Sequence, residues 1–226
     1  MGSAYPLAMF PLSVVLYPYA DLPLQLFEPR YLALLEDCLA GSRELGLVLI
    51  SRGSEVGGGD QRVDVGTIAR IVHVEPMPGG RFFVVVRGLR RMRVVEWLDD
   101  DPYPRAQVEE GPDGDWVEVL GAEAGSVGPR LLAEAELAVR RVRSLLSELD
   151  RVPALAHDAD FGDEPDEVIW RLCASAPLNA LDGLELLATD DPVDRLALLV
   201  RRCDEVAGDV TALLAGGGGP AGDREA

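Results

Sequence analysis

In the first half of the chain, apolar positions fall into short runs separated by turn residues, a pattern that predicts β-strands. Runs cover residues 9–16, 22–27 and 45–50, and the last has no charged or polar side chain, as in a strand buried on both faces. Residues 65–76 and 81–97 form two longer runs joined by Pro78-Gly79-Gly80, which predicts a hairpin. Gly88 interrupts the second run, where we expect a bulge or bend. A short strand over residues 103–110 completes the set, and strands at this spacing predict a small barrel or rolled sheet.

One segment of this half changes to the periodicity of a helix. Pro29 suits a first helical turn, where its missing N–H costs nothing, and Gly41 is a typical stop. Between them the apolar positions recur in steps of three and four: Tyr31, Leu34, Leu35, Cys38 and Leu39. We therefore expect a helix with one buried face, which contains Tyr31 and Leu35.

The second half of the chain is helical throughout. Apolar stripes predict helices over residues 129–146, 165–173 and 181–188, and a last one that starts at Asp191-Pro192. The expected fold class is α+β, with a β-rich lobe over residues 7–120 and a helical bundle over residues 126–215. The glycine-rich residues 216–226 are expected to be a disordered tail.

Charge and hydropathy exclude several classes of function. The net charge is −18, from 39 acidic and 21 basic residues, and such a surface repels phosphate backbones. Every basic residue is arginine, which excludes a Walker A lysine, a Schiff-base lysine and a Ser-Lys dyad. The apolar runs are too short to span a bilayer and no secretion signal opens the chain, so we expect a cytoplasmic protein without membrane contact.

No group of residues predicts a catalytic or metal centre. Cys38, Cys173 and Cys203 are far apart and lie in apolar stripes, where buried thiols are expected. His73 and His157 have no nucleophile elbow or ligand spacing near them. The acidic residues between Asp99 and Glu118 lie in a Pro- and Gly-bearing stretch and indicate a solvated face. We accordingly predict no catalytic residue, no cofactor and no metal.

A local basic stripe on one expected strand leaves an alternative open. Within residues 81–93 the stripe consists of Arg81, Arg87, Arg90, Arg91 and Arg93. It could hold a nucleic-acid backbone, or it could pair with the acidic stretch that follows it. Since the whole chain is strongly acidic, we expect the second.

Several phrases, taken in order, are similar to the N-terminal domain of the Lon protease family. They begin with Phe10-Pro11-Leu12 and Leu22-Pro23-Leu24-Gln25-Leu26-Phe27-Glu28-Pro29-Arg30-Tyr31, and continue with Leu45-Gly46-Leu47-Val48-Leu49-Ile50 and Val65-Gly66-Thr67-Ile68-Ala69. Ser175-Ala176-Pro177-Leu178 and Asp194-Arg195-Leu196 extend the resemblance into the helical half, so that it covers about residues 7–207. The order and spacing of these phrases carry the resemblance, because no single phrase is diagnostic.

The resemblance implies a PUA-like β lobe followed by a helical bundle, and a role in recognising protein substrates. We expect a freestanding, non-catalytic member of the family that acts as an adaptor or regulator in protein quality control. Its expected partner is unfolded polypeptide or another protein, a protease complex included. The alternatives are a PUA-like nucleic-acid-binding protein that uses the arginine stripe, and a metal-dependent enzyme.

A protein that binds unfolded chain must leave apolar surface uncovered. The candidate polypeptide-binding residues are Tyr17, Tyr19, Met77, Phe82 and Trp97, which lie in turns or at strand ends. Core packing is the expected role of Phe82 and Trp97. Tyr17, Tyr19 and Met77 flank prolines, where burial is harder, and are therefore the stronger candidates.

Overall fold

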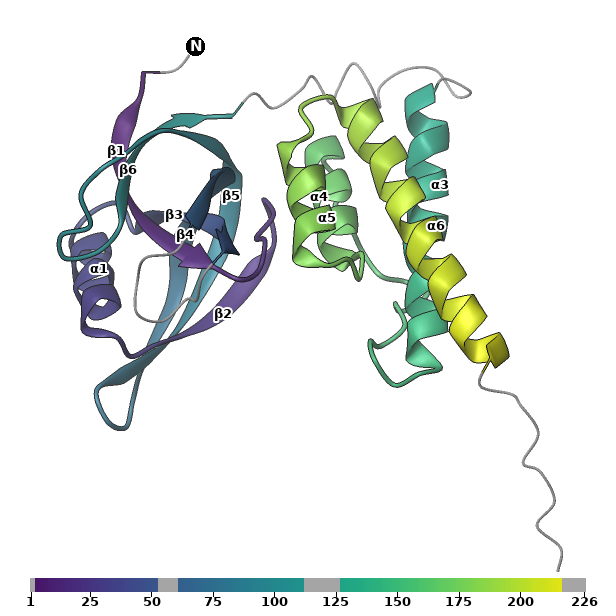
Figure 1. Ribbon diagram of the computed structural model, residues 1–226, viewed down its shortest axis with the longest axis horizontal. Coiled ribbons are helices and arrows are strands. Elements are labelled where there is room, and N and C mark those ends of the chain that lie inside the picture. The colour runs from purple at the N-terminus through teal and green to yellow at the C-terminus, as the bar shows by residue number, and fades with distance from the viewer. Residues whose placement is uncertain (1–2, 53–60, 112–126, 217–226) are drawn as a thin grey trace, which may run out of the picture.

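The computed structural model describes residues 3–52, 61–111 and 127–216, which form two lobes side by side (Figure 1). The β lobe contains β1 (Tyr5–Leu12), β2 (Asp21–Leu26), α1 (Pro29–Ala40), β3 (Glu44–Arg52), β4 (Gln61–Met77), β5 (Arg81–Trp97) and β6 (Arg105–Glu110). The helical lobe contains α3 (Val127–Ser147), α4 (Pro165–Ser175), α5 (Ala180–Ala188) and α6 (Pro192–Gly216). The α+β class is confirmed. The expected tail lies outside the described residues, except for Gly216, which ends α6.

The β lobe is one mixed sheet with the strand order β2-β5-β4-β3-β1-β6, in which β5 also pairs with β6. β1 and β3 are parallel, and the other pairs are antiparallel. β4 pairs with β5 from Arg81 to Arg93, and on its other edge β5 pairs first with β2 and then, from Met92 onward, with β6, so the sheet bends strongly.

The bend in β5 occurs at Gly88, as the sequence predicts. The β4–β5 register shifts between the pairs Ile68↔Arg90 and Ala69↔Gly88, which leaves Leu89 as a bulge. A Cβ atom at position 88 would lie 2.1 Å from the carbonyl oxygen of Tyr17, so only glycine allows the loop after β1 to approach. The hairpin between β4 and β5 turns through Gly79 and Gly80, both with positive φ.

Buried side chains form a core on each face of the sheet and a third core in the helical lobe. One face of the sheet packs against α1 through Tyr31, Leu34, Leu35 and Cys38, so the predicted buried face of this helix is confirmed. The other face packs through residues such as Met9, Ile68 and Met92. In the helical lobe, α3 and α6 lie against each other, and α4 and α5 lie between this pair and the sheet (Figure 1).

Two of the predicted elements differ in extent from the apolar runs. The first run, residues 9–16, becomes the end of β1 and the loop that follows it, since β1 spans Tyr5–Leu12. The last stripe is buried at Leu196, Leu199, Cys203 and Val210, but its final member, Leu213, is exposed.

Candidate functional site

The loop between β1 and β2 joins the two lobes through its tyrosines. Tyr17 is only 7% exposed, its ring stacks on Trp170 at 6.0 Å between centroids, and its hydroxyl donates to the carbonyl of Gly183 at 3.0 Å. Burial raises the pKa of Tyr17 well above its ordinary value, so this hydroxyl stays a donor. Tyr19, in the left-handed region at φ 63°, donates its hydroxyl to the carboxylate of Asp166. The expectation that Tyr17 is hard to bury is wrong, because the second lobe covers it.

We call the contact between the two lobes the lobe seam. Two buried arginines, at the C-terminal end of α5, complete it. Arg91 of β5, 3% exposed, donates through one nitrogen to the carbonyls of Leu187 and Thr189, at 3.1 and 3.3 Å, and to the Asp190 carboxylate at 2.9 Å. Arg195 of α6 donates to the carbonyl of Leu186 and lies 4.0 Å above the ring of Trp170. The last carbonyls of a helix have no partner within the helix and carry partial negative charge, so the two guanidinium groups satisfy them.

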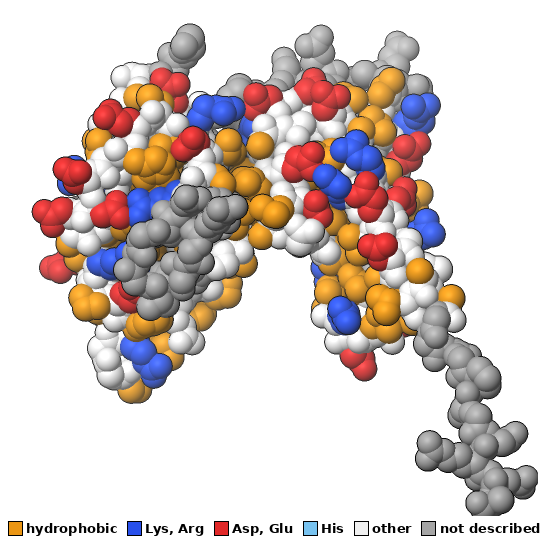
Figure 2. All heavy atoms as spheres, viewed as in Figure 1, with side chains coloured by type: hydrophobic (Ala, Val, Ile, Leu, Met, Phe, Trp, Pro, Cys, Tyr) orange, Lys and Arg blue, Asp and Glu red, His pale blue; other side chains and the backbone are white. Residues whose placement is uncertain are grey.

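Beside this seam the surface is hollowed between the lobes. One hollow of about 360 Å³ lies between the loop that joins β1 to β2 and the connection between α4 and α5. Its lining includes Val14, Val15, Leu22 and Leu178. A second, of about 370 Å³, lies between Tyr19 and Arg87 on one side and Leu155 and Phe161 on the other. Both are lined by Asp21 and Ala174, so they adjoin, and we call them together the interlobe groove. Figure 2 shows the hollow between the lobes, with hydrophobic side chains along the inner side of each.

On the β lobe, the wall of the interlobe groove continues along β2 and β5 as a partly apolar surface. Asp21 and Arg87 line the groove and pair across β2 and β5. Side chains two residues apart lie on the same face of a strand, which places Pro23, Phe83 and Val85 on the face of Asp21 and Arg87. All three are exposed or half-buried.

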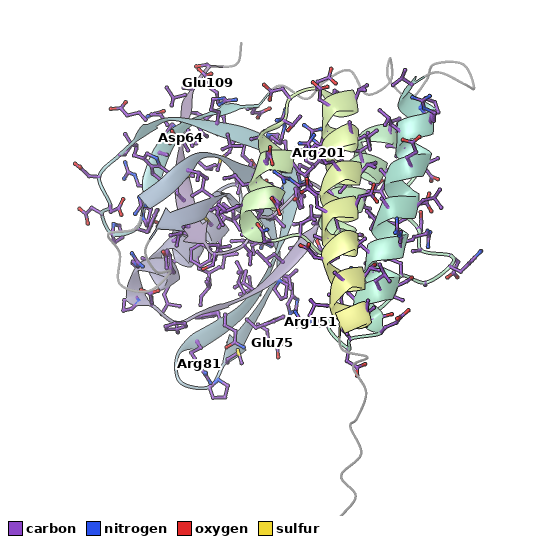
Figure 3. All side chains as sticks on the ribbon, turned by 45° about the vertical axis from the view of Figure 1, so that its right-hand side comes forward. Asp64, Glu75, Arg81, Glu109, Arg151 and Arg201 are labelled. Carbon is purple, nitrogen blue, oxygen red and sulfur yellow. The ribbon has the colours of Figure 1, made fainter. Side chains whose placement is uncertain are left out.

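The five candidate residues do not share one surface. Tyr17 and Tyr19 lie at the lobe seam, whereas Met77 and Phe82 lie at the end of the β4–β5 hairpin, marked in Figure 3 by Glu75 and Arg81. Phe82 packs against the core beneath α1, as expected. Trp97 ends β5, where its Nε1–H donates to Asp64 at 3.3 Å, and Asp64 lies far from the hairpin in Figure 3. The structure therefore separates the candidates into three places.

The basic stripe is largely neutralised. Arg87 pairs with Asp21 at 2.7 Å, and Arg90 pairs with Glu44 at 3.1 Å and Glu110 at 2.7 Å. The hydrogen bond from Arg87 lowers the pKa of the Asp21 carboxyl. Of these three acids only Glu110 belongs to the acidic stretch that follows the stripe. The expected pairing between stripe and stretch is therefore correct for one contact, while Asp21 and Glu44 precede the stripe in the sequence. Arg91 is buried under the helical lobe rather than exposed beside Arg93, as alternation along the strand would suggest.

The described residues offer no evident reactive group. Burial raises the pKa of Cys38 to about 11, and of Cys173 and Cys203 to about 12, so all three thiols stay protonated near neutral pH. His73 and His157 are both exposed. Within the described ranges no group of three or more His, Cys, Asp or Glu residues could hold a metal ion, and no helix there is long and apolar enough to cross a membrane.

Sequence reasoning missed residues that shape the groove and the seam. Val14 is 47% exposed and lines the groove, but it belongs to an apolar run that predicts a strand. Trp170 and Arg195 lie at helical spacings that indicate only which face is buried. The signal that could have indicated a polar contact inside the fold is an arginine at the spacing of the apolar stripe: Arg195 stands four residues before Leu199 and is fully buried.

Fold and site together define a two-lobe α+β domain with a partly apolar groove between the lobes. Residues 6–203 match the profile of the ATP-dependent protease La (LON) substrate-binding domain. The chain belongs to this family, as the resemblance in the sequence indicates.

Curated relatives and solved structures agree with this assignment. The Lon protease of Desulfovibrio desulfuricans is 27% identical over 193 residues, which are 82% of this chain and 20% of that protein. A LON peptidase N-terminal domain and RING finger protein of Schizosaccharomyces pombe is 23% identical over 219 residues, 84% of this chain and 43% of the relative. The chain thus spans less than half the length of these relatives, and the matched family is the substrate-binding domain, not the protease domain.

Among solved structures, the Lon N-terminal domain protein from Xanthomonas campestris is similar with a TM-score of 0.60 and 29% identity, over 87% of this chain and 98% of that one. The N-terminal domain of the Mycobacterium avium complex Lon protease has a TM-score of 0.57 over 89% of this chain and 99% of that one; at 19% identity it supports the fold alone.

Proposed function

We propose that this domain recognises protein substrates by binding extended, unfolded polypeptide in the interlobe groove. The observation that carries the proposal is the pair of adjoining hollows, which meet at Asp21 and Ala174 and have apolar side chains along both walls. An unfolded chain offers mainly backbone groups and hydrophobic side chains, and a groove of this kind accommodates both. Membership of a substrate-binding domain family supports the same class of ligand.

Apolar contact supplies most of the affinity in this proposal. Charged groups at the groove already have partners, since Asp21 pairs with Arg87 and Arg171 pairs with Glu167 at 2.7 Å. Binding should therefore depend only weakly on salt. A nucleic-acid ligand is disfavoured, because three of the five arginines of the stripe, Arg87, Arg90 and Arg91, already pair with carboxylates.

We further infer that the domain is non-catalytic and acts as an adaptor or regulator of proteolysis, with an unfolded client or a protease complex as its partner. The bent mixed sheet is consistent with the PUA-like kind that the family resemblance implies. The division into lobes over residues 7–120 and 126–215 is part of the same proposal.

The test is fluorescence anisotropy of a labelled, permanently unfolded protein, such as reduced and carboxymethylated lactalbumin, titrated with this domain. Val14→Glu places a charge in the groove and should weaken binding several-fold. Val95→Glu is the matched control, because Val95 is similarly exposed but does not line the groove. Equal affinities of the two folded variants would remove the groove as the site, and no binding by the wild type would overturn the proposed function.

A further inference from the structure

The sheet has an edge strand at the interlobe groove. In the strand order β2 lies at the end and pairs only with β5 among the described strands. Figure 1 places β2 on the side of the β lobe that faces the helical lobe. An unpaired strand edge presents a row of N–H and C=O groups that another chain can pair with.

The register identifies which backbone groups lie on this edge. The carbonyl of Ala20 accepts a hydrogen bond from the N–H of Gly88, so position 20 faces β5. Backbone groups alternate in direction along a strand, so positions 22, 24 and 26 also face β5, and Asp21, Pro23 and Gln25 face away from it. The outward position of Pro23 agrees with this, since proline has no N–H to donate to β5.

Both ends of the edge open into hollows. At its start, Ala20, Asp21 and Leu22 line the larger hollow of the interlobe groove. At its end, Gln25, Leu26 and Phe27 line a smaller hollow of about 60 Å³, together with Phe10, Pro11, Glu28 and Tyr31. Phe27, 54% exposed, offers an aromatic surface there.

We propose that the unfolded polypeptide binds by adding a strand to the free edge of β2. This deepens the proposed function and rests on it. The N–H and C=O groups of Asp21 and Gln25 and the C=O of Pro23 bond the backbone of the client, and client side chains pack on Phe27 and into the larger hollow. Because backbone groups carry the recognition, the domain accepts many sequences but rejects clients with proline or N-methylated residues at the bonding positions.

Pro23 favours an unfolded client over a second copy of the chain as the binding partner of the β2 edge. If two β2 strands paired with each other, each would bring an outward-facing proline to an edge of only six residues, and bonds would be lost at both. A client segment without proline loses only the bond that Pro23 cannot donate. Pro23 thus disfavours self-association of the edge and leaves it available to an extended client.

Three variants test the edge directly. Gln25→Pro removes one outward N–H and should weaken binding of the labelled unfolded protein at least fivefold, whereas Gln25→Ala keeps the N–H and should stay within about twofold of the wild type. Pro23→Val adds an outward N–H and should strengthen binding about twofold or more. Circular dichroism and urea unfolding establish that each variant is folded.

A second measurement on the unaltered domain covers the case in which Gln25→Pro fails to fold. A short binding peptide is N-methylated at each position in turn, and strand addition predicts that binding is lost at every second position. Equal affinity of folded Gln25→Pro and Gln25→Ala, or losses without this period of two, would overturn strand addition. In that case the proposed function survives if Val14→Glu still weakens binding.

A wild-type domain that does not bind unfolded protein overturns both strand addition and the proposed function. If Pro23→Val dimerises through this edge and does not gain affinity for the client, the edge belongs to a second copy of the chain.

Discussion

Arg91 shows at the scale of one residue how the lobes are held. Its guanidinium bonds two carbonyls of the α5 C-terminus and the Asp190 carboxylate while it is itself nearly inaccessible to solvent. Truncation would leave these buried acceptors with fewer donors, which costs more than an average surface contact.

We therefore expect Arg91→Ala to lower the free energy of unfolding by roughly 2–4 kcal/mol. Arg93→Ala, two positions along the same strand but exposed, should change it by less than about 0.5 kcal/mol. Urea unfolding followed by circular dichroism measures both. If both substitutions lower the free energy of unfolding by the same small amount, the contacts of Arg91 do not stabilise the association of the two lobes.

Glu44 gives a prediction for pH dependence. Burial raises the pKa of its carboxyl, but the hydrogen bonds from Arg70 and Arg90 outweigh this, and the net result is a pKa below the ordinary value of 4.5. A lowered folded-state pKa contributes stability that is present above pH 4.5 and is lost as the pH falls through the folded-state value.

Between pH 7 and pH 3, Glu44→Gln should accordingly lose less stability than the wild type. Urea unfolding of both proteins at the two pH values gives the difference. If the two proteins lose stability in parallel, the ion pairs of Glu44 do not contribute to folding.

At the scale of elements, substitutions in α1 test whether its apolar stripe packs against the sheet. Leu35 is buried against the sheet, so Leu35→Ala should cost roughly 2–5 kcal/mol. Leu181→Ala makes the same substitution at an exposed position of α5 and should cost less than about 0.5 kcal/mol. A loss at Leu35 as small as that at Leu181, in the same urea experiment, would contradict the packing.

Periodicity predicts the elements well because each helix buries one stripe, while strands such as β3 that are buried on both faces appear as continuous apolar runs. The helix of residues 29–40, the hairpin at Gly79-Gly80 and the bulge at Gly88 all follow from local signals. The candidate site does not, because exposure depends on the other lobe. Tyr17 flanks a proline in a loop and is nevertheless buried by α4 and α5, and Val14 belongs to an apolar run and is nevertheless exposed.

At the scale of the whole molecule, the composition predicts what the purified protein does not do. With no lysine, it has neither a Walker A lysine nor a Ser-Lys dyad. We expect no ATP hydrolysis and no degradation of casein above a mock purification from the same host. Either activity, if it follows the protein through several columns and reappears in an unrelated recombinant host, would refute the proposal that the domain is non-catalytic.

The central claim is that unfolded polypeptide lies in the groove between the lobes, and hydrogen–deuterium exchange tests it most directly. The domain is exchanged alone and with saturating unfolded lactalbumin, and peptides covering the whole chain are compared. The account predicts slower exchange over residues 13–27 and 174–183, with no change at the hairpin end around Met77 and Phe82. Protection confined to the hairpin end or to Trp97, with the groove unchanged, would contradict it.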